Sequence, residues 1–310
     1  MEMGRAPERA AGQKYTASMS LSPAPLGNVA AAPVIGPGLA LAVASGLALL
    51  GYVWVGLLRA RASDGQPADA ALRPPLRSVP PMALAWTAQF IALYLDISGF
   101  GLTTPGARFG FAPALSMTMW LVLTVYLVES RFLPLHSVRR VLAWLAAAAV
   151  MLAWCFPGES RPTAASPWAP LHWVLGLASY GLFGVAVLHA ALTNRAEARL
   201  RHRQAGAGGM PLLQLERLTF QFVAAGVGVL SLAIVLGWWF TPQWHWDHKN
   251  LLAVLGWLVL TGLLVGRRVY GWRGRRATRW LYAGAALLLL SYAGSRFVLE
   301  VVLQRGGGPA

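Results

Sequence analysis

The residues best suited to bind a metal or an aromatic cofactor lie between positions 237 and 250. Four tryptophans, two histidines and an aspartate fall within eleven positions: Trp238, Trp239, Trp244, His245, Trp246, Asp247 and His248. Imidazole is a common metal ligand, and indole offers a large flat apolar face. Tryptophan is also enriched where membrane helices meet water, so an interfacial aromatic belt is the alternative interpretation. A belt does not explain why histidines and an acid alternate with the indoles, and we interpret the segment as a candidate binding site.

The same residue types meet the chemical needs of a haem. Stacked indoles suit the apolar porphyrin face, and haem iron takes imidazole as an axial ligand. The anionic propionates need basic partners near the lipid headgroups. The candidate imidazoles are His172, His245 and His248, and the candidate cations are Lys249, Arg296 and Arg108. The single cysteine, Cys155, excludes an internal disulfide, a CxxC redox pair and covalent attachment through CxxCH, so a haem would be held non-covalently.

The composition indicates that these residues belong to an integral membrane protein. Of the 310 residues, 56% are hydrophobic and only 12% are charged, and the mean hydropathy is +0.53. A soluble domain carries about 25% charged residues. A chain this apolar cannot cover itself with a polar surface, which excludes a disordered chain, a secreted disulfide scaffold and an ordinary cytosolic enzyme.

Eight apolar stretches are long enough, or nearly so, to cross a hydrocarbon core, which takes about 20 helical residues. Barrel strands alternate between polar and apolar residues, whereas these runs are continuous, so they favour helices. The predicted fold class is an all-α, polytopic membrane helix bundle. The predicted spans are residues 37–58, 81–98, 111–128, 140–156, 171–193, 217–240, 250–266 and 280–303.

The basic residues predict the orientation of this bundle. Most of the 26 Lys and Arg residues follow the first, third, fifth and seventh spans, whereas the opposite loops hold only Arg108, Arg161 and Lys249. The positive-inside rule places the basic loops in the cytoplasm and both termini outside it. The net charge of +15 is therefore a topology signal, which leaves the lipid bilayer as a partner and excludes nucleic acid.

We expect one membrane domain over residues 37–303, because the connections are too short to hold a soluble domain. Residues 1–36 are rich in Ala, Pro, Gly and Ser and predict a flexible tail without the pattern of a signal peptide. Residues 304–310 form a short C-terminal tail.

Several motifs resemble the cytochrome c assembly family, which includes the haem-handling membrane proteins CcsA, ResC and CcmC. Trp244, Trp246, Asp247 and Lys249 match the tryptophan-rich WWD signature, roughly WGxxWxWD followed by Pro-Lys-Glu, while His248 and Asn250 replace the Pro and Glu. The likeness is closest to the smaller YpjD/HemX-type branch of the inner membrane. It covers roughly residues 40–303 and rests also on Leu215-Glu216-Arg217-Leu218, Gly271-Trp272-Arg273-Gly274-Arg275-Arg276 and Gly294-Ser295-Arg296-Phe297-Val298-Leu299-Glu300.

The resemblance implies that the Trp-rich loop cradles haem b at the outer face of the bacterial inner (plasma) membrane. The cofactor-binding residues would be His172, Trp238, Trp244, His245, Trp246, Asp247, His248, Lys249 and Arg296, with His172 and His248 as iron ligands. The second family histidine normally lies in a later stretch like Leu-His-Ser-Tyr, which this chain replaces with Gly294-Ser295-Arg296-Phe297-Val298. Either His245 or His248 supplies the second bond, or this branch has lost haem binding and keeps only the scaffold.

The implied role is in cytochrome c biogenesis, with haem bound or presented to an apo-cytochrome c. The thiols and the reductant for attachment would come from other maturation proteins, so we expect at most a part of an attachment complex rather than an autonomous enzyme. Two alternatives stay open, a transporter for a small ion or solute and a non-catalytic membrane scaffold for tetrapyrrole synthesis. The transporter would use intramembrane polar groups, namely Asp96, His189, Arg296 and Glu300.

Overall fold

The computed structural model describes residues 37–58, 79–98, 107–132, 136–157, 159–161, 168–201, 212–240 and 246–298. All of them belong to the unit formed by residues 35–310. The expected tails at 1–36 and 304–310 lie outside the described residues. Eight long helices account for most of the described chain: α1 (Pro37–Leu57), α2 (Val79–Ser98), α3 (Phe111–Glu129), α4 (His136–Cys155), α5 (Ala169–Arg201), α6 (Leu212–Phe240), α7 (His248–Tyr270) and α8 (Gly274–Leu289).

The eight helices confirm the predicted all-α, polytopic architecture, since each predicted span overlaps one helix. A membrane interior offers no partners for backbone polar groups, and helices satisfy these groups internally. Among the described residues, six helices are long and apolar enough to cross a membrane: α1, α3, α4, α5, α6 and α7. Helix α8 falls outside this set because it has 16 residues and carries Arg275, Arg276 and Arg279 near its start.

Two features of the structure were not predicted, one in the eighth span and one beside α3 and α4. The α-helix changes to a π-helix, η2 (Leu290–Gly294), which is followed by the short helix α9 (Ser295–Phe297). Two short strands, β1 (Ala107–Phe109) and β2 (Glu159–Arg161), also pair antiparallel, with Arg108 opposite Ser160. These strands connect the segment before α3 to the segment after α4.

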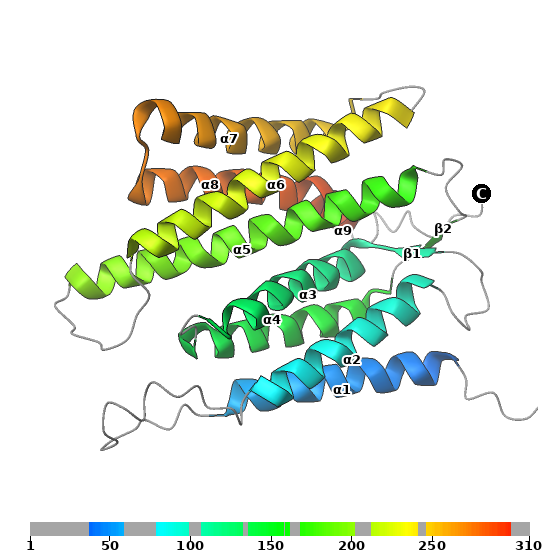
Figure 1. Cartoon of the computed structure of the whole chain (residues 1–310). Coiled ribbons are helices and arrows are strands. Elements are labelled where there is room, and N and C mark those ends of the chain that lie inside the picture. The colour runs from blue at the N-terminus through cyan, green and yellow to red at the C-terminus, as the bar shows by residue number, and fades with distance from the viewer. Residues whose placement is uncertain are drawn as a thin grey trace, which may run out of the picture. The chain divides into compact units, whose positions relative to one another are not determined.

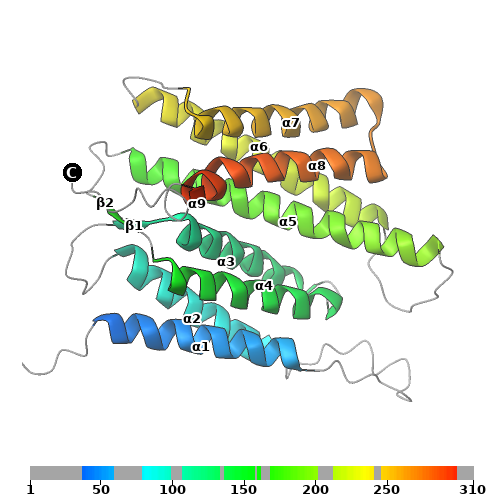
Figure 2. The ribbon, with the colours of Figure 1, turned by 180° about the vertical axis from the view of Figure 1, so that it is seen from behind.

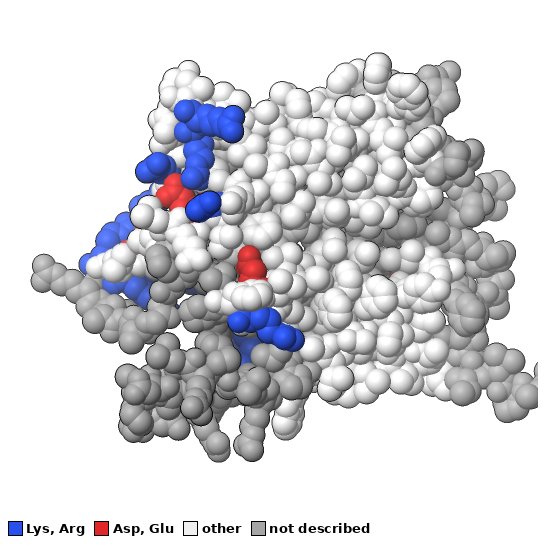
Figure 3. Space-filling model, viewed as in Figure 1, with Lys and Arg blue, Asp and Glu red and all other residues white. Residues whose placement is uncertain are grey.

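Successive helices run in alternate directions, as Figures 1 and 2 show. The connections after α1, α3, α5 and α7 therefore lie at one end of the bundle. Figure 3 shows the described Lys and Arg side chains gathered at this end, which we call the basic end. By the positive-inside rule the basic end faces the cytoplasm, and the opposite end is the outer one.

The helices pack around two buried apolar clusters. The first joins the N-terminal helices through Tyr52, Met82, Leu123 and Leu142. The second joins α5 to α8 through Phe183, Val223, Leu260 and Leu281. The second cluster holds in place the four helices whose ends carry most of the predicted site residues.

Candidate functional site

His172 lies in the first turn of α5 and packs against α6 at the outer end of the bundle. Its Nδ1 is 2.8 Å from the carbonyl oxygen of Ala233. A carbonyl only accepts hydrogen bonds, so Nδ1 of the neutral ring carries the proton and Nε2 carries the lone pair. Metal-ligating histidines are oriented by the same kind of bond from the other ring nitrogen. The arrangement thus leaves Nε2 as the ring nitrogen with the chemistry to bind a metal.

Gly237 fixes the ring of His172 from the same face of α6. Ala233 and Gly237 are four residues apart, which places them on one side of the helix. A Cβ at Gly237 would lie 2.8 Å from Cε1 and 3.1 Å from Nδ1 of His172. Only glycine lets the α6 backbone approach the imidazole this closely.

The tryptophans near this histidine are unusually exposed. The indoles of Trp238, Trp239 and Trp246 are 66%, 78% and 68% exposed, respectively. Large exposed apolar surfaces mark contacts with lipid, a ligand or another protein. The predicted site residues Trp244 and His245 lie outside the described residues.

The start of α7 is connected to the π-helical segment η2. The Ser291 hydroxyl donates to the Lys249 carbonyl at 2.8 Å, and the Lys249 ammonium lies 5.6 Å from the centre of the Tyr292 ring. Lys249 is also close enough to act electrostatically on His172. π-Helical turns are frequent at functional sites. The structure therefore brings His172, Lys249 and η2 into one neighbourhood.

The structure describes the other predicted site residues in less detail. Asp247 precedes the first turn of α7 and His248 begins it, both exposed to the surroundings. Arg296 lies in α9, where the structure describes its backbone but not its side chain. Glu300, which the transporter alternative would use together with Arg296, is outside the described residues.

The described residues near His172 are of the kinds that a haem would need. Nowhere in the described part of the chain do three or more His, Cys, Asp or Glu side chains form a group that could hold a metal. Haem iron needs only axial ligands from the protein, because the porphyrin supplies the others. The oriented His172, the exposed indoles and the nearby Lys249 are what such a group requires.

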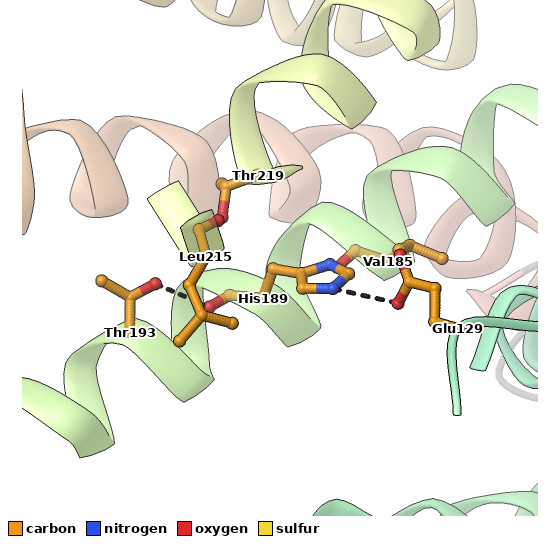
Figure 4. Close-up of polar contacts among 6 residues, drawn as sticks. All are labelled: Glu129, Val185, His189, Thr193, Leu215 and Thr219. Carbon is orange, nitrogen blue, oxygen red and sulfur yellow. Dashed lines mark hydrogen bonds and ion pairs between the residues drawn. The ribbon is translucent and has the colours of Figure 1, made fainter. Parts of the chain in front are cut away.

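A second histidine forms a buried cluster toward the basic end. His189 is fully buried, its Nδ1 lies 3.0 Å from the Val185 carbonyl, and its ring stacks on Phe222. Its Nε2 lies 3.1 Å from Oε2 of Glu129, which is 13% exposed, in an ion-pair contact outside ideal hydrogen-bond geometry (Figure 4). Both ring nitrogens therefore face oxygens of the protein, one of a backbone carbonyl and one of a carboxylate.

His189 and His172 cannot share a ligand. They lie 17 residues apart on the continuous helix α5, a separation of about 25 Å at 1.5 Å per residue. Nothing in the sequence pattern singled out Glu129, which ends an otherwise apolar run in another helix.

Two of the other motifs meet at the basic end. Oε1 of Glu216 lies 4.0 Å from Nη1 of Arg267 and 3.9 Å from Nε of Arg273. The Arg267 guanidinium stacks 3.5 Å above the Phe220 ring. Residues 215–218 and 271–276 thus form one structural corner between α6, α7 and α8.

Asp96, which the sequence suggested for an ion path, lines a cavity near the outer ends of α1, α2 and α4. Its side chain is 6% exposed, and the cavity has a volume of about 280 Å³. Other polar groups on the wall come from Ser45, Gln89 and Ser116. The Gln89 amide accepts a hydrogen bond from the Tyr52 hydroxyl and donates one to Ser116. These bonds hold the polar part of the cavity wall in place.

Residues 88–303 match the family described as cytochrome C assembly protein. The inner membrane protein YpjD of Escherichia coli (strain K12) is 31% identical over 143 residues, which are 44% of this chain and 54% of that protein. The cytochrome c biogenesis protein CcsA of Parasynechococcus marenigrum (strain WH8102) is 28% identical over 165 residues, 43% of this chain and 53% of that protein. The chain spans about half the length of these curated relatives. No solved structure matches the chain significantly.

Proposed function

The chain belongs to the cytochrome c assembly protein family, and from this premise we propose that it binds haem at the outer end of its bundle for cytochrome c biogenesis. The observation that carries the proposal is the geometry around His172. Its Nδ1 bond to Ala233 and its close packing on Gly237 orient an imidazole at the helix end where indoles are exposed. The inner membrane is the proposed location, in keeping with the name of the relative YpjD.

Haem, when bound, would supply the iron and the broad apolar ring. His172 would provide Nε2 as one ligand of the iron. Trp238 and Trp246, with Trp244, would cover the ring and exclude water. Lys249 and Arg296 would pair with the propionates. His248 is our candidate for the second ligand, and His245 is the alternative.

The proposed partners are proteins that would supply the thiols for haem attachment. Its one cysteine, Cys155, cannot form the CxxCH thiols to which haem is attached. An apo-cytochrome c would bring those thiols, and other maturation proteins would keep them reduced. The role of this chain is then to hold and present haem rather than to catalyse attachment alone.

The test is the visible absorption spectrum of the full chain purified in mild detergent from haem-replete cells. We expect a Soret band at about one haem per chain in the wild-type protein, and its loss in His172→Ala. His136→Ala, at the basic end, is the matched control and should keep the band. Folded wild-type protein without haem would overturn the proposal.

The Asp96 cavity favours a second candidate, transport of a small cation or polar solute. Ionisable groups at membrane depth often mark such pathways. In this case Asp96→Asn would abolish ion-dependent uptake into proteoliposomes, whereas Glu197→Gln at the basic end would not. Absence of both haem and uptake would leave a scaffold for tetrapyrrole synthesis as the remaining candidate.

A further inference from the structure

A basic groove lies between α5 and α8, at the end of the bundle opposite to His172. Its volume is about 630 Å³. Helix α5 contributes Asn194 and Arg201 to its wall, and α8 contributes Arg275, Thr278, Arg279 and Tyr282. Figure 2 shows α5 and α8 side by side on this face of the bundle.

Helical spacing explains why these side chains converge. Asn194 and Arg201 are seven residues apart, as are Arg275 and Tyr282, and residues at this spacing share one face of a helix. The two faces meet, and the Asn194 amide donates to the Tyr282 hydroxyl at 3.3 Å. This bond closes the groove on the side of the membrane interior.

The charge of the groove is not balanced by its own wall. Three guanidinium groups line it, and no acidic residue is among the lining residues. Outside the lining residues, Oε2 of Glu197 lies 4.0 Å from Nη2 of Arg201, whose side chain is 60% exposed, and Oε1 would lie 3.8 Å from a Cβ at Gly274. An exposed ion pair at this distance contributes little. The groove therefore attracts an anion from its surroundings.

The surroundings are the cytoplasmic headgroup layer. Residues 194–201 are the polar end of a helix about 50 Å long, which extends beyond a hydrocarbon core of about 30 Å. Anionic phospholipids supply negative charge at this surface, and basic pockets between helices bind their headgroups. Beyond Tyr282, the exposed Ala286 and Leu289 continue the same face of α8 toward the membrane interior. This apolar stripe suits an acyl chain.

We propose that the groove binds the phosphate headgroup of an anionic phospholipid. Arginine suits this role because its planar guanidinium forms paired hydrogen bonds with phosphate oxygens. Arg275 and Arg279 hold the phosphate from α8, and Arg201 approaches it from α5. The bound lipid joins α5 to α8 at the basic end, and this role is independent of haem.

The test uses the full chain in dodecyl maltoside micelles doped with phosphatidylglycerol or phosphatidylcholine, with bound lipid counted by native mass spectrometry. We expect phosphatidylglycerol to bind more tightly than phosphatidylcholine. The double variant Arg275→Gln/Arg279→Gln should weaken the binding of phosphatidylglycerol about tenfold, since each basic residue near the membrane surface contributes substantially to the attraction of anionic lipids. Arg140→Gln/Arg268→Gln removes the same charge from the basic end outside the groove and should leave the affinity within about twofold.

Equal losses in both double variants would overturn the proposal, because general surface charge would then explain the binding. Inorganic phosphate tests the other source of the same chemistry. If millimolar phosphate displaces phosphatidylglycerol and stabilises the chain equally well, the site binds free phosphate and the lipid assignment is wrong. Arg275→Lys/Arg279→Lys keeps the charge and the fold, and an intermediate affinity would support paired guanidinium contacts.

Discussion

Gly237 of α6 packs directly on the imidazole of His172 in α5, and a methyl group at Gly237 would lie 2.8 Å from Cε1 of the ring. The Ala233 carbonyl, one turn earlier, accepts the hydrogen bond of the same ring. The backbone of α6 therefore sets both the position and the tautomer of His172. The glycine that begins the Trp-rich segment and the histidine that begins α5 act as one structural unit.

This contact predicts a specific effect of Gly237→Ala. The new methyl group must displace the His172 ring, because 2.8 Å is too short for a carbon contact. We expect the haem content of the purified chain to fall by more than half while the helix content stays unchanged. The Soret absorbance per protein and the circular dichroism spectrum measure the two quantities.

Gly228→Ala is the matched control in the same helix, since a Cβ there meets no atom within 4 Å. Replacing a helical glycine with alanine stabilises a helix by about 0.5–1 kcal/mol where space allows. Gly228→Ala should thus keep its haem and gain slightly in thermal stability. Full haem occupancy in Gly237→Ala would show that the ring position does not control binding.

Residue types and spacing alone suggested some residues of this candidate site. The indoles and Lys249 stood out because tryptophans, histidines and an acid rarely alternate in one loop. Ala233 and Gly237 did not stand out, since their role depends on a helix that lies elsewhere in the chain. Glu129 was missed for the same reason, because its partner His189 is in another helix. One sequence carries no record of such distant contacts.

The second axial ligand gives a further prediction. Two imidazoles produce a six-coordinate, low-spin haem, and loss of one leaves a high-spin spectrum. If His248 supplies the second bond, His248→Ala should convert the spectrum to high spin while retaining the haem on His172. His245→Ala should leave the low-spin spectrum unchanged.

The reverse pattern would assign the ligand to His245 instead. A low-spin spectrum in both single variants and in the double variant would exclude this loop as the source. Added imidazole provides a check, because it should restore the low-spin spectrum of the variant that lacks the true ligand.

The fold was more predictable than the site because hydropathy reports directly on membrane burial. It located all eight helices but ended the fifth near 193, whereas α5 continues to Arg201. The last turns of α5 contain polar residues such as Arg and Glu, which are good helix formers outside the membrane. The π-helix at Leu290–Gly294 left no signal, because hydropathy does not distinguish a π-helical turn from an α-helical one.

Gly271 ends α7 in the left-handed conformation, with a φ of +63°. A side chain in this conformation costs about 1–2 kcal/mol, although a Cβ at Gly271 would meet no atom within 4 Å. Gly271→Ala should therefore lower the unfolding temperature without any steric clash. Gly262→Ala, inside α7 and also without near neighbours, should raise it slightly. An unchanged unfolding temperature in Gly271→Ala would mean that this corner does not limit stability.

The buried pair of His189 and Glu129 predicts strong energetic coupling between α3 and α5. Glu129→Leu leaves the buried imidazole without the carboxylate that it contacts, and an uncompensated buried polar group costs about 1–3 kcal/mol. His189→Phe leaves the carboxylate alone at a similar cost, whereas the double variant replaces the pair with apolar groups and should recover much of the loss. Denaturant unfolding of the full chain in detergent should give a coupling energy of about 1–3 kcal/mol.

The exposed pair of Glu197 and Arg201 is the comparison, and its cycle should give less than about 0.5 kcal/mol. Additive effects of Glu129→Leu and His189→Phe would contradict an energetic interaction between the two side chains and leave them as independent packing residues.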